Sequence, residues 1–247
     1  MRRVEGLSCD STHEISKLQA RVNGASPYPW PNSTSMAKVD YYRNALRLLF
    51  ILVRGCESFS DENFPNDVGV FDGEVKLQAL DFWIRYPDYL ADELLAKYEA
   101  TGTRRYLDTA RRIFDDEEPD LRRVPMLRNY FGAYEPIDTA IAHLKARGLV
   151  TPRTKPLGKA ANHRDFLVSR AAFDLVERIV AELPEFYWYE SRVRLVLEMV
   201  DGRGGGALKQ RQHEQKEYHE TRRGDLIPTI AERVRKRLAD ALEAANG

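Results

Sequence analysis

The sequence predicts a mainly α-helical protein with a helical N-terminal region, a winged helix-turn-helix with a small β-wing, and a helical C-terminal tail. Apolar residues recur at spacings of three and four in most predicted elements, which is the period of a helix. One such helix ends at Gly148 and runs into a basic, hairpin-like segment, and another amphipathic helix follows directly. Modules of this kind bind nucleic acid or a protein partner.

The composition indicates a soluble protein with a substantial core. Of 247 residues, 43% are hydrophobic and 31% charged, so disorder is not expected. The longest apolar run, 48–53, is much shorter than the ~18 residues of a membrane-spanning helix, and we expect no membrane association. Thirty-eight basic residues balance thirty-eight acidic ones, so the net charge gives no indication of a nucleic-acid partner.

The cysteine content favours a reducing, cytoplasmic setting. Cys9 and Cys56 are the only two cysteines, so one chain can build neither a disulfide framework nor a thiolate metal site. We therefore expect no metal and no cofactor.

The N-terminal half of the chain divides into a polar segment and a helical region. Residues 1–36 are expected to be flexible, without a secretory signal, because no apolar segment follows the first arginines. The helical region covers 37–87 and begins with a strongly apolar, buried helix at 40–54. Turn residues gather at 57–72, which predicts an irregular loop. A second helix then covers 74–86 and ends because a proline follows it.

The predicted winged-helix module covers 88–183. Its expected elements are helices at 89–99, 103–114 and 137–147, strands at 149–151 and 166–168, and a helix at 171–183. In the third helix an apolar stripe faces the core, and Gly148 provides a left-handed stop. The stripe consists of Ile137, Ala140, Ile141 and Leu144.

C-terminal helices make up 184–247. A proline opens a helix at 185–200, and the glycine-rich segment 202–206 is predicted to be a flexible hinge. A polar helical tail follows, with interruptions near Gly224 and Pro228.

The local motifs offer no support for a catalytic site. The glycines of 202–206 lack the lysine and hydroxyl residue of a P-loop. His213 and His219 are six residues apart, roughly 600° of helix, so they do not form a zinc-binding pair on one helix face. Catalytic groups can still converge in three dimensions, and a cleft with three or more buried ionisable groups would indicate an enzyme.

A cluster of cations predicts contact with an anionic partner. Between Lys145 and Arg170 the chain carries seven basic residues and a single acid, Asp165. Contacts with phosphates would be independent of DNA sequence and sensitive to salt. The nucleic-acid-binding candidates are Arg153, Lys155, Lys159, Arg164 and Arg170. A wing that is merely solvated is the alternative.

The start of the helix that would read DNA bases is acidic. Glu135 and Asp138 would repel phosphates, and few side chains suited to base contacts follow. A winged helix that binds protein, or only the DNA backbone, therefore fits better than a sequence-specific reader.

Two further clusters are candidates for partner binding. The aromatic cluster consists of Phe186, Tyr187, Trp188 and Tyr189, and aromatic side chains are favoured at interfaces. We expect at least half of these to belong to the core. The tail contributes the cations Arg233, Arg235, Lys236 and Arg237, for which a solvated helix is the alternative.

Several segments resemble the small middle subunit of bacterial three-component ABC-ATPase conflict systems, including Lamassu-type anti-phage defence. The similarity spans about Val39 to Leu242, and its most specific part is the motif from Leu80 to Pro87. The other matching segments are Gly69 to Glu74, Lys76 to Ala79, Ala142 to Val150, Trp188-Tyr189 with Arg192, and Ile227-Pro228.

This resemblance implies a non-catalytic adaptor that joins an SMC- or Rad50-like ATPase and helps to hold an effector subunit, commonly a nuclease. The partner would bind ATP, and double-stranded DNA could contact the adaptor without sequence preference. A stand-alone winged-helix transcription regulator is the alternative hypothesis, and an effector enzyme with dispersed residues is the third.

Overall fold

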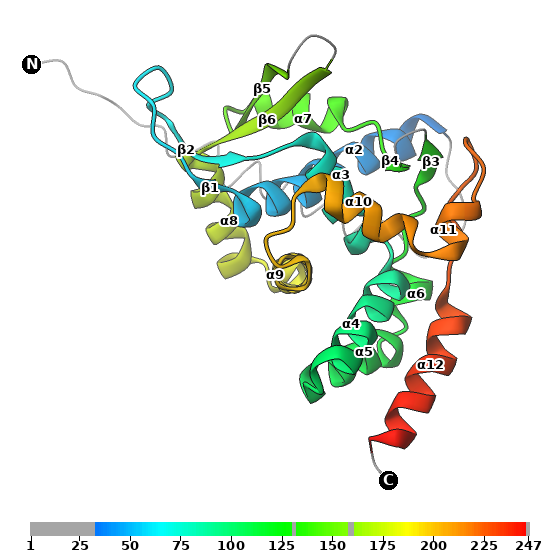
Figure 1. Ribbon diagram of the computed structural model, residues 1–247. Coiled ribbons are helices and arrows are strands. Elements are labelled where there is room, and N and C mark those ends of the chain that lie inside the picture. The colour runs from blue at the N-terminus through cyan, green and yellow to red at the C-terminus, as the bar shows by residue number, and fades with distance from the viewer. Residues whose placement is uncertain (1–32, 130–131, 158–160, 246–247) are drawn as a thin grey trace, which may run out of the picture.

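The protein is mainly helical with a small antiparallel sheet (Figure 1). The computed structural model describes residues 33–129, 132–157 and 161–245. The helices are α2 (Ser33–Gly55), α3 (Glu74–Arg85), α4 (Pro87–Thr101), α5 (Arg104–Asp115), α6 (Glu118–Leu121), α7 (Asp138–Lys145), α8 (Arg170–Glu182), η1 (Pro184–Phe186), α9 (Tyr187–Val200), α10 (Gly205–His213), α11 (Lys216–Glu220) and α12 (Ala231–Ala244). The strands are β1 (Glu57–Ser58), β2 (Asp67–Phe71), β3 (Leu127–Asn129), β4 (Gly132–Tyr134), β5 (Val150–Leu157) and β6 (Ala161–Ser169).

Helix α2 forms the centre of the core. Its run of apolar residues at 48–53 is buried on all sides, against α3, α7, α8 and α9. The expected helix at 40–54 is therefore confirmed. It begins earlier, because 33–36, part of the segment expected to be flexible, belong to α2. Residues 1–32 lie outside the described residues. No helix in the described part of the chain is long and apolar enough to span a bilayer.

The sheet has the strand order β1-β2-β6-β5, with every pair antiparallel. Strand β2 lies inside the segment 57–72, so the prediction of an irregular loop was wrong there. Phe71 is fully buried and pairs with Phe166 of β6. Turn residues dominate this segment locally, and only pairing with a strand about a hundred residues away makes it extended.

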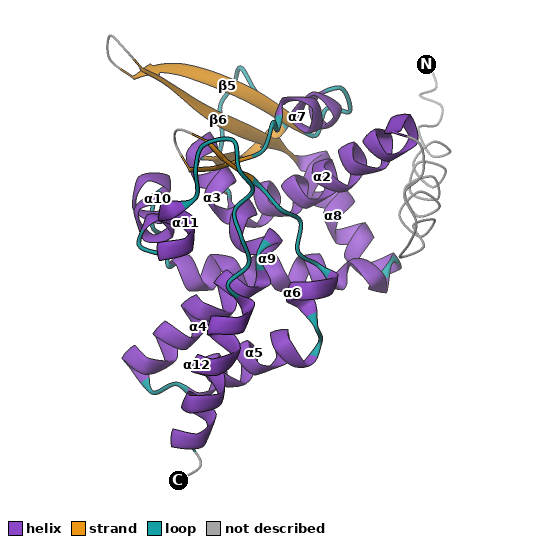
Figure 2. Cartoon of the chain, turned by 90° about the vertical axis from the view of Figure 1, so that its right-hand side faces the viewer, coloured by secondary structure: helices purple, strands orange, loops and turns teal. Residues whose placement is uncertain are grey.

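The β5–β6 hairpin is longer than the two short strands predicted at 149–151 and 166–168. The basic segment between them forms the paired strands themselves. Charged residues and prolines are uncommon in strands, but β5 is an edge strand, where Pro152 and Pro156 are tolerated and discourage further strand pairing. The hairpin projects from the helical body (Figure 2).

A buried polar network joins α3 to its surroundings. Asp81 is fully buried between the guanidinium groups of Arg47 on α2 and Arg85. Arg85 also donates to the carbonyl oxygens of Val124 and Pro125, at 2.9 and 2.8 Å. An isolated buried carboxylate would be strongly destabilising, so this pairing fixes how α2, α3 and the segment before β3 pack together.

Tyr86, directly after α3, extends the network toward the C-terminus. Its hydroxyl accepts a hydrogen bond from the Met126 amide at 2.8 Å and donates to the Ile227 carbonyl at 3.0 Å. Burial raises the pKa of Tyr86 to about 12, so the hydroxyl keeps its proton. Asp88 accepts hydrogen bonds from the Thr229 hydroxyl and the Ile230 amide, both at 2.6 Å. Together we call Asp81, Arg85, Tyr86 and Asp88 the polar hub.

The C-terminal tail packs back on the helices that follow the hub. Helices α4, α5 and α12 form the tapered lower end of the molecule (Figures 1 and 2), and α12 packs on both of the others. Helices α4 and α12 lie on opposite sides of the boundary predicted at residue 183, and they pack together. Strands β2 and β6 lie on opposite sides of the boundary predicted at residue 87, and they pair with each other. The tail interruption predicted near Gly224 and Pro228 lies between α11 and α12.

The glycine-rich segment predicted as a flexible hinge at 202–206 is helical in its last two residues. Gly205 begins α10, and a Cβ atom there would lie 2.6 Å from the backbone nitrogen of Lys76 on α3. The missing side chain lets α10 pack closely against α3. The neighbouring Gly206 has open space around the equivalent position.

These two glycines give a matched test of the close approach. Gly205→Ala should lower the free energy of unfolding by about 1–3 kcal/mol, because backbone must shift to admit the methyl group. Gly206→Ala should stay within about 1 kcal/mol of the wild type, on the stabilising side, since alanine favours a helix. Urea unfolding of both variants measures this. Equal stabilities would contradict the packed α3–α10 contact.

Candidate functional site

The cations of the wing are largely paired with carboxylates of the same chain. Arg153 and Lys155 both contact Asp165, at 2.9 and 2.7 Å, across the β5–β6 ladder. Burial alone would raise the pKa of Asp165, but hydrogen bonds from Lys155 and Arg153 outweigh this effect and lower it. The one acid of the basic segment thus neutralises part of the predicted phosphate-binding surface.

Arg164 is held by carboxylates from two other elements. Its Nη1 atom lies 2.7 Å from Asp138 of α7 and 3.2 Å from Glu74 of α3. Burial opposes the charge, yet hydrogen bonding to Asp138 and the charge of Glu74 raise the pKa of Arg164. The neighbouring His163 contacts Asp72 at 2.8 Å. Arg164 thus ties the wing to α3 and α7, a role that sequence spacing did not suggest.

The structure therefore does not bring the four described wing cations together as one free surface. Lys159 lies outside the described residues. Lys155 keeps a side chain that is 51% exposed, and Arg170 is exposed at the start of α8. Only these two of the described candidates still present charge mainly to solvent.

Helix α7 confirms the apolar stripe predicted for it. The four stripe residues are buried, and Gly148 has a left-handed φ of 65°. Its exposed surface carries Asp138, Thr139, Ala142 and Lys145. This is a poor set for hydrogen bonds to base edges.

The aromatic cluster divides between core and surface. Phe186 is buried, and Tyr189 is half-buried and stacks on Phe50 with ring centroids 6.0 Å apart. Trp188 is half-buried beside the arginine Arg122, whose guanidinium lies 4.7 Å from the ring centroid. Tyr187 is 60% exposed. We expected at least half of the cluster to belong to the core; Phe186 is a core residue, and Trp188 and Tyr189 pack against the core while partly buried.

Three of the four tail cations clamp α12 onto other helices. Arg237 contacts Asp92 at 2.6 Å and Glu99 at 2.7 Å, both on α4. Arg233 contacts Asp92 and Glu217, and Arg235 contacts Asp120 at 2.9 Å. Only Lys236 is exposed with no partner among the described residues. The three arginines therefore mainly hold α12 against other helices of the same chain.

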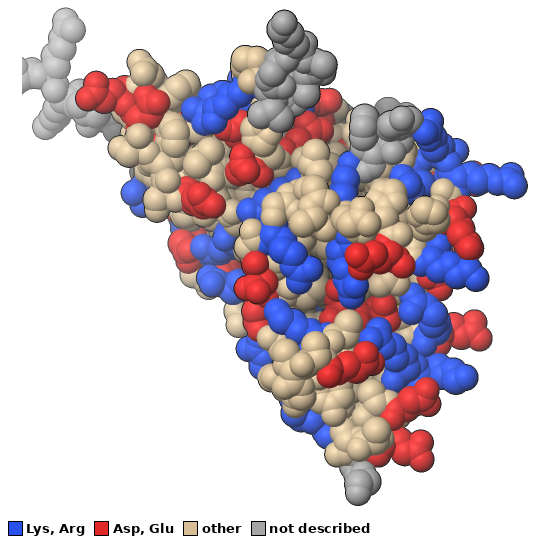
Figure 3. All heavy atoms as spheres, in the orientation of Figure 1, with Lys and Arg blue, Asp and Glu red and all other residues tan. Residues whose placement is uncertain are grey.

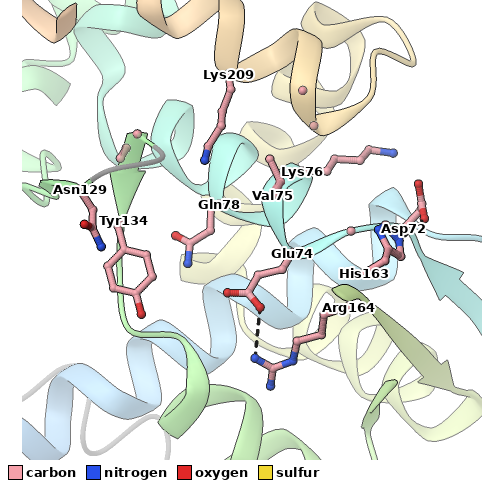
Figure 4. A pocket seen from close by; sticks show the side chains of 15 residues that line it. Asp72, Glu74, Val75, Lys76, Gln78, Asn129, Tyr134, His163, Arg164 and Lys209 are labelled. Carbon is pink, nitrogen blue, oxygen red and sulfur yellow. Dashed lines mark hydrogen bonds and ion pairs between the residues drawn. The ribbon is translucent and has the colours of Figure 1, made fainter. Parts of the chain in front are cut away.

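A cavity of about 560 Å³ lies where α3, the β3–β4 hairpin, β6 and α10 meet (Figure 4). Lys209 extends from α10 toward Gln78, while Tyr134 and the Glu74–Arg164 ion pair lie further down. Burial and the nearby Arg128 lower the pKa of Lys209. The lining offers hydrogen-bonding groups, but no nucleophile among the lining residues is held by a general base.

Buried ionisable groups serve packing more than they line clefts. A second cavity, of about 450 Å³, lies between α5, α6 and α9 and contains two such groups, Glu118 and Arg192. The first cavity contains none. Within the described residues no group of three His, Cys, Asp or Glu side chains could hold a metal ion.

The surface charges are interspersed. On the face shown in Figure 3, basic and acidic side chains alternate over the helices without a broad area of one sign. Comparison with known proteins finds no matching family model, no matching curated sequence and no matching solved structure.

The Asp165 pairings predict a pH-dependent effect of Asp165→Asn. The carboxylate has a lower pKa when folded than its ordinary value of about 3.9, so its contribution is complete above that value. As the pH falls through the folded pKa, the contribution disappears. The variant should be less stable by about 1–3 kcal/mol at pH 7, and the difference should shrink below pH of about 4.

Urea unfolding at pH 7 and at acidic pH measures this effect. Asp108→Asn is the matched control, because its pair with Arg104 is exposed and should contribute less than about 1 kcal/mol. The same deficit of Asp165→Asn at both pH values would contradict the charge-based account.

Proposed function

We propose that the protein is a non-catalytic adaptor subunit of a Lamassu-type anti-phage complex, which joins an SMC-like ATPase to an effector, commonly a nuclease. The observation that carries the proposal is the contrast between paired cations on the wing and exposed apolar side chains on another face. Three of the four described wing cations are paired with carboxylates of the same chain, whereas the face of α6 and α9 leaves Leu121 and Tyr187 exposed by 72% and 60%. Large exposed apolar side chains favour a protein partner over DNA.

We further propose that the chain contains a winged helix, with an extent different from the predicted 88–183. In this proposal α2, α3 and α7 are its three helices, and β2, β6 and β5 are its sheet. The strand order β2-β6-β5 and the packing of α7 against α2 and β5 support the assignment. The elements from α4 to β4 would then be an insertion between the second and third helices.

The position of the resembling motif is consistent with the adaptor proposal. Residues Leu80 to Pro87 contain most of the polar hub, where they contact other parts of the same chain. A motif with this role would maintain the shape of a binding subunit.

Co-expression with the neighbouring genes tests the proposal. Affinity purification of the tagged chain, mass spectrometry and a size measurement should recover a large ATPase in stoichiometric amount. Tyr187→Ala should lower ATPase recovery at least about fivefold, as expected for an aromatic residue at an interface. Leu226→Ala, another exposed apolar residue, should retain it. Recovery of the chain alone as a homodimer would contradict the proposal.

DNA binding separates the adaptor from a transcription regulator. The adaptor should bind its own upstream DNA and a scrambled duplex within about threefold in affinity, whereas a regulator should prefer its site by ~10³ or more. Lys155→Gln with Arg170→Gln should reduce the salt dependence by at most about two counterions. Arg111→Gln with Lys236→Gln is the control, with two exposed cations on other helices. A strong preference for the upstream site would favour the regulator.

A further inference from the structure

The cavity of about 450 Å³ between α5, α6 and α9 lies on the face that carries Tyr187. Arg192 and Trp188 of α9 line one part of it, and Arg105, Thr109 and Arg112 of α5 line another. Helix α6 closes it through Glu118, which accepts hydrogen bonds from Nη2 of Arg192 at 2.5 Å. Four arginines line this cavity, and two of them, Arg105 and Arg194, pair with Glu198 and Glu190.

Three buried donors on Arg192 and Trp188 lack an acceptor. The Arg192 side chain is 6% exposed, and its Nε and Nη1 atoms have no hydrogen-bond partner. The indole Nε1 of Trp188 is also buried and unpartnered. Burial lowers the pKa of Arg192 despite the opposing charge of Glu118. Each unpaired buried donor is destabilising, so the site is poised for an added acceptor.

The charges around the donors favour an anionic acceptor. Arg112 donates to the Thr109 hydroxyl at 3.3 Å but has no carboxylate partner among the described residues. Arg122 is exposed and lies over the Trp188 ring without any carboxylate partner in the described chain. Because stacking alone holds it there, this side chain can rotate aside to admit a ligand.

The rim favours a peptide over nucleic acid. Three acids, Asp116, Glu118 and Glu198, also line the cavity and would repel a run of phosphates. A peptide needs to place only one carboxylate among the donors. Its neighbouring apolar side chain can then cover Tyr187, which lines the cavity, and Leu121, which precedes Arg122 at the end of α6.

We propose that this cavity is the docking site for an acidic peptide segment of a partner protein, in which a carboxylate next to an apolar or aromatic side chain binds Arg192 and Trp188. The identity of the protein that supplies the peptide rests on the proposed adaptor function, whereas the binding site itself does not. Arg112 adds charge attraction, and Tyr187 adds the apolar contact.

Indole signals in the NMR spectrum of the full ¹⁵N-labelled chain provide the test. The probe is a random copolymer of glutamate and tyrosine, and Trp188→Phe identifies the Trp188 Nε1–H signal. That signal should move to lower field during the titration because the donor gains an acceptor. The signal of Trp83, which is buried beside Phe82, should not move.

Two neighbouring arginines of α5 supply matched variants. Arg112→Glu should weaken the copolymer titration at least about tenfold, because Arg112 lines the cavity. Arg111→Glu should change it by less than about twofold, because this exposed residue pairs with Asp115 away from the lining. Both substitutions are at exposed positions, so folding is preserved.

Several outcomes would overturn the inference. An unmoved Trp188 signal would mean that water satisfies the donors. Equal weakening by both α5 variants would mean general charge attraction. A tighter response to a double-stranded DNA fragment than to the copolymer would make the cavity a nucleic-acid site. The titration uses the chain alone, so its failure is distinguishable from a failure to co-purify the ATPase.

Discussion

The buried pairing of Asp81 with Arg47 and Arg85 is the constraint on which the rest of the structure depends. A carboxylate with no exposure must have its charge balanced, and the two guanidinium groups come from α2 and from α3 itself. Arg85 then fixes the chain before β3, and Tyr86 and Asp88 fix the chain before α12. One short stretch of sequence thereby sets the relative positions of α2, the segment before β3 and the segment before α12.

Ion pairs within the chain also determine which charges remain available on the surface. Carboxylates of α3, α7 and β6 neutralise much of the wing, and those of α4 hold the cations of α12. Many charged side chains that could bind a partner, judged from the sequence alone, therefore form ion pairs within the chain. What the α6–α9 face presents instead is Leu121, Tyr187 and a cavity with unpaired donors. These features support the proposed role as a binding subunit.

Local patterns predicted the helices well, because their signals lie within a few residues. The apolar stripe of α7 and the left-handed Gly148 are examples. Strand β2 could not be predicted, since its pairing partner lies far away in the chain. The same holds for the candidate site: Asp165 pairs locally across the hairpin, but Arg164 meets Glu74 only in three dimensions. The close approach of Gly205 to α3 likewise has no local signal.

The central claim is that the polar hub joins distant segments into one unit, and hydrogen exchange of Tyr86→Phe tests it most directly. Removing the hydroxyl should speed exchange of the Met126 and Ile227 amides at least about tenfold, because both depend on that junction. The Val176 amide in α8 should exchange as in the wild type. Unchanged protection of Met126 and Ile227 would contradict the account.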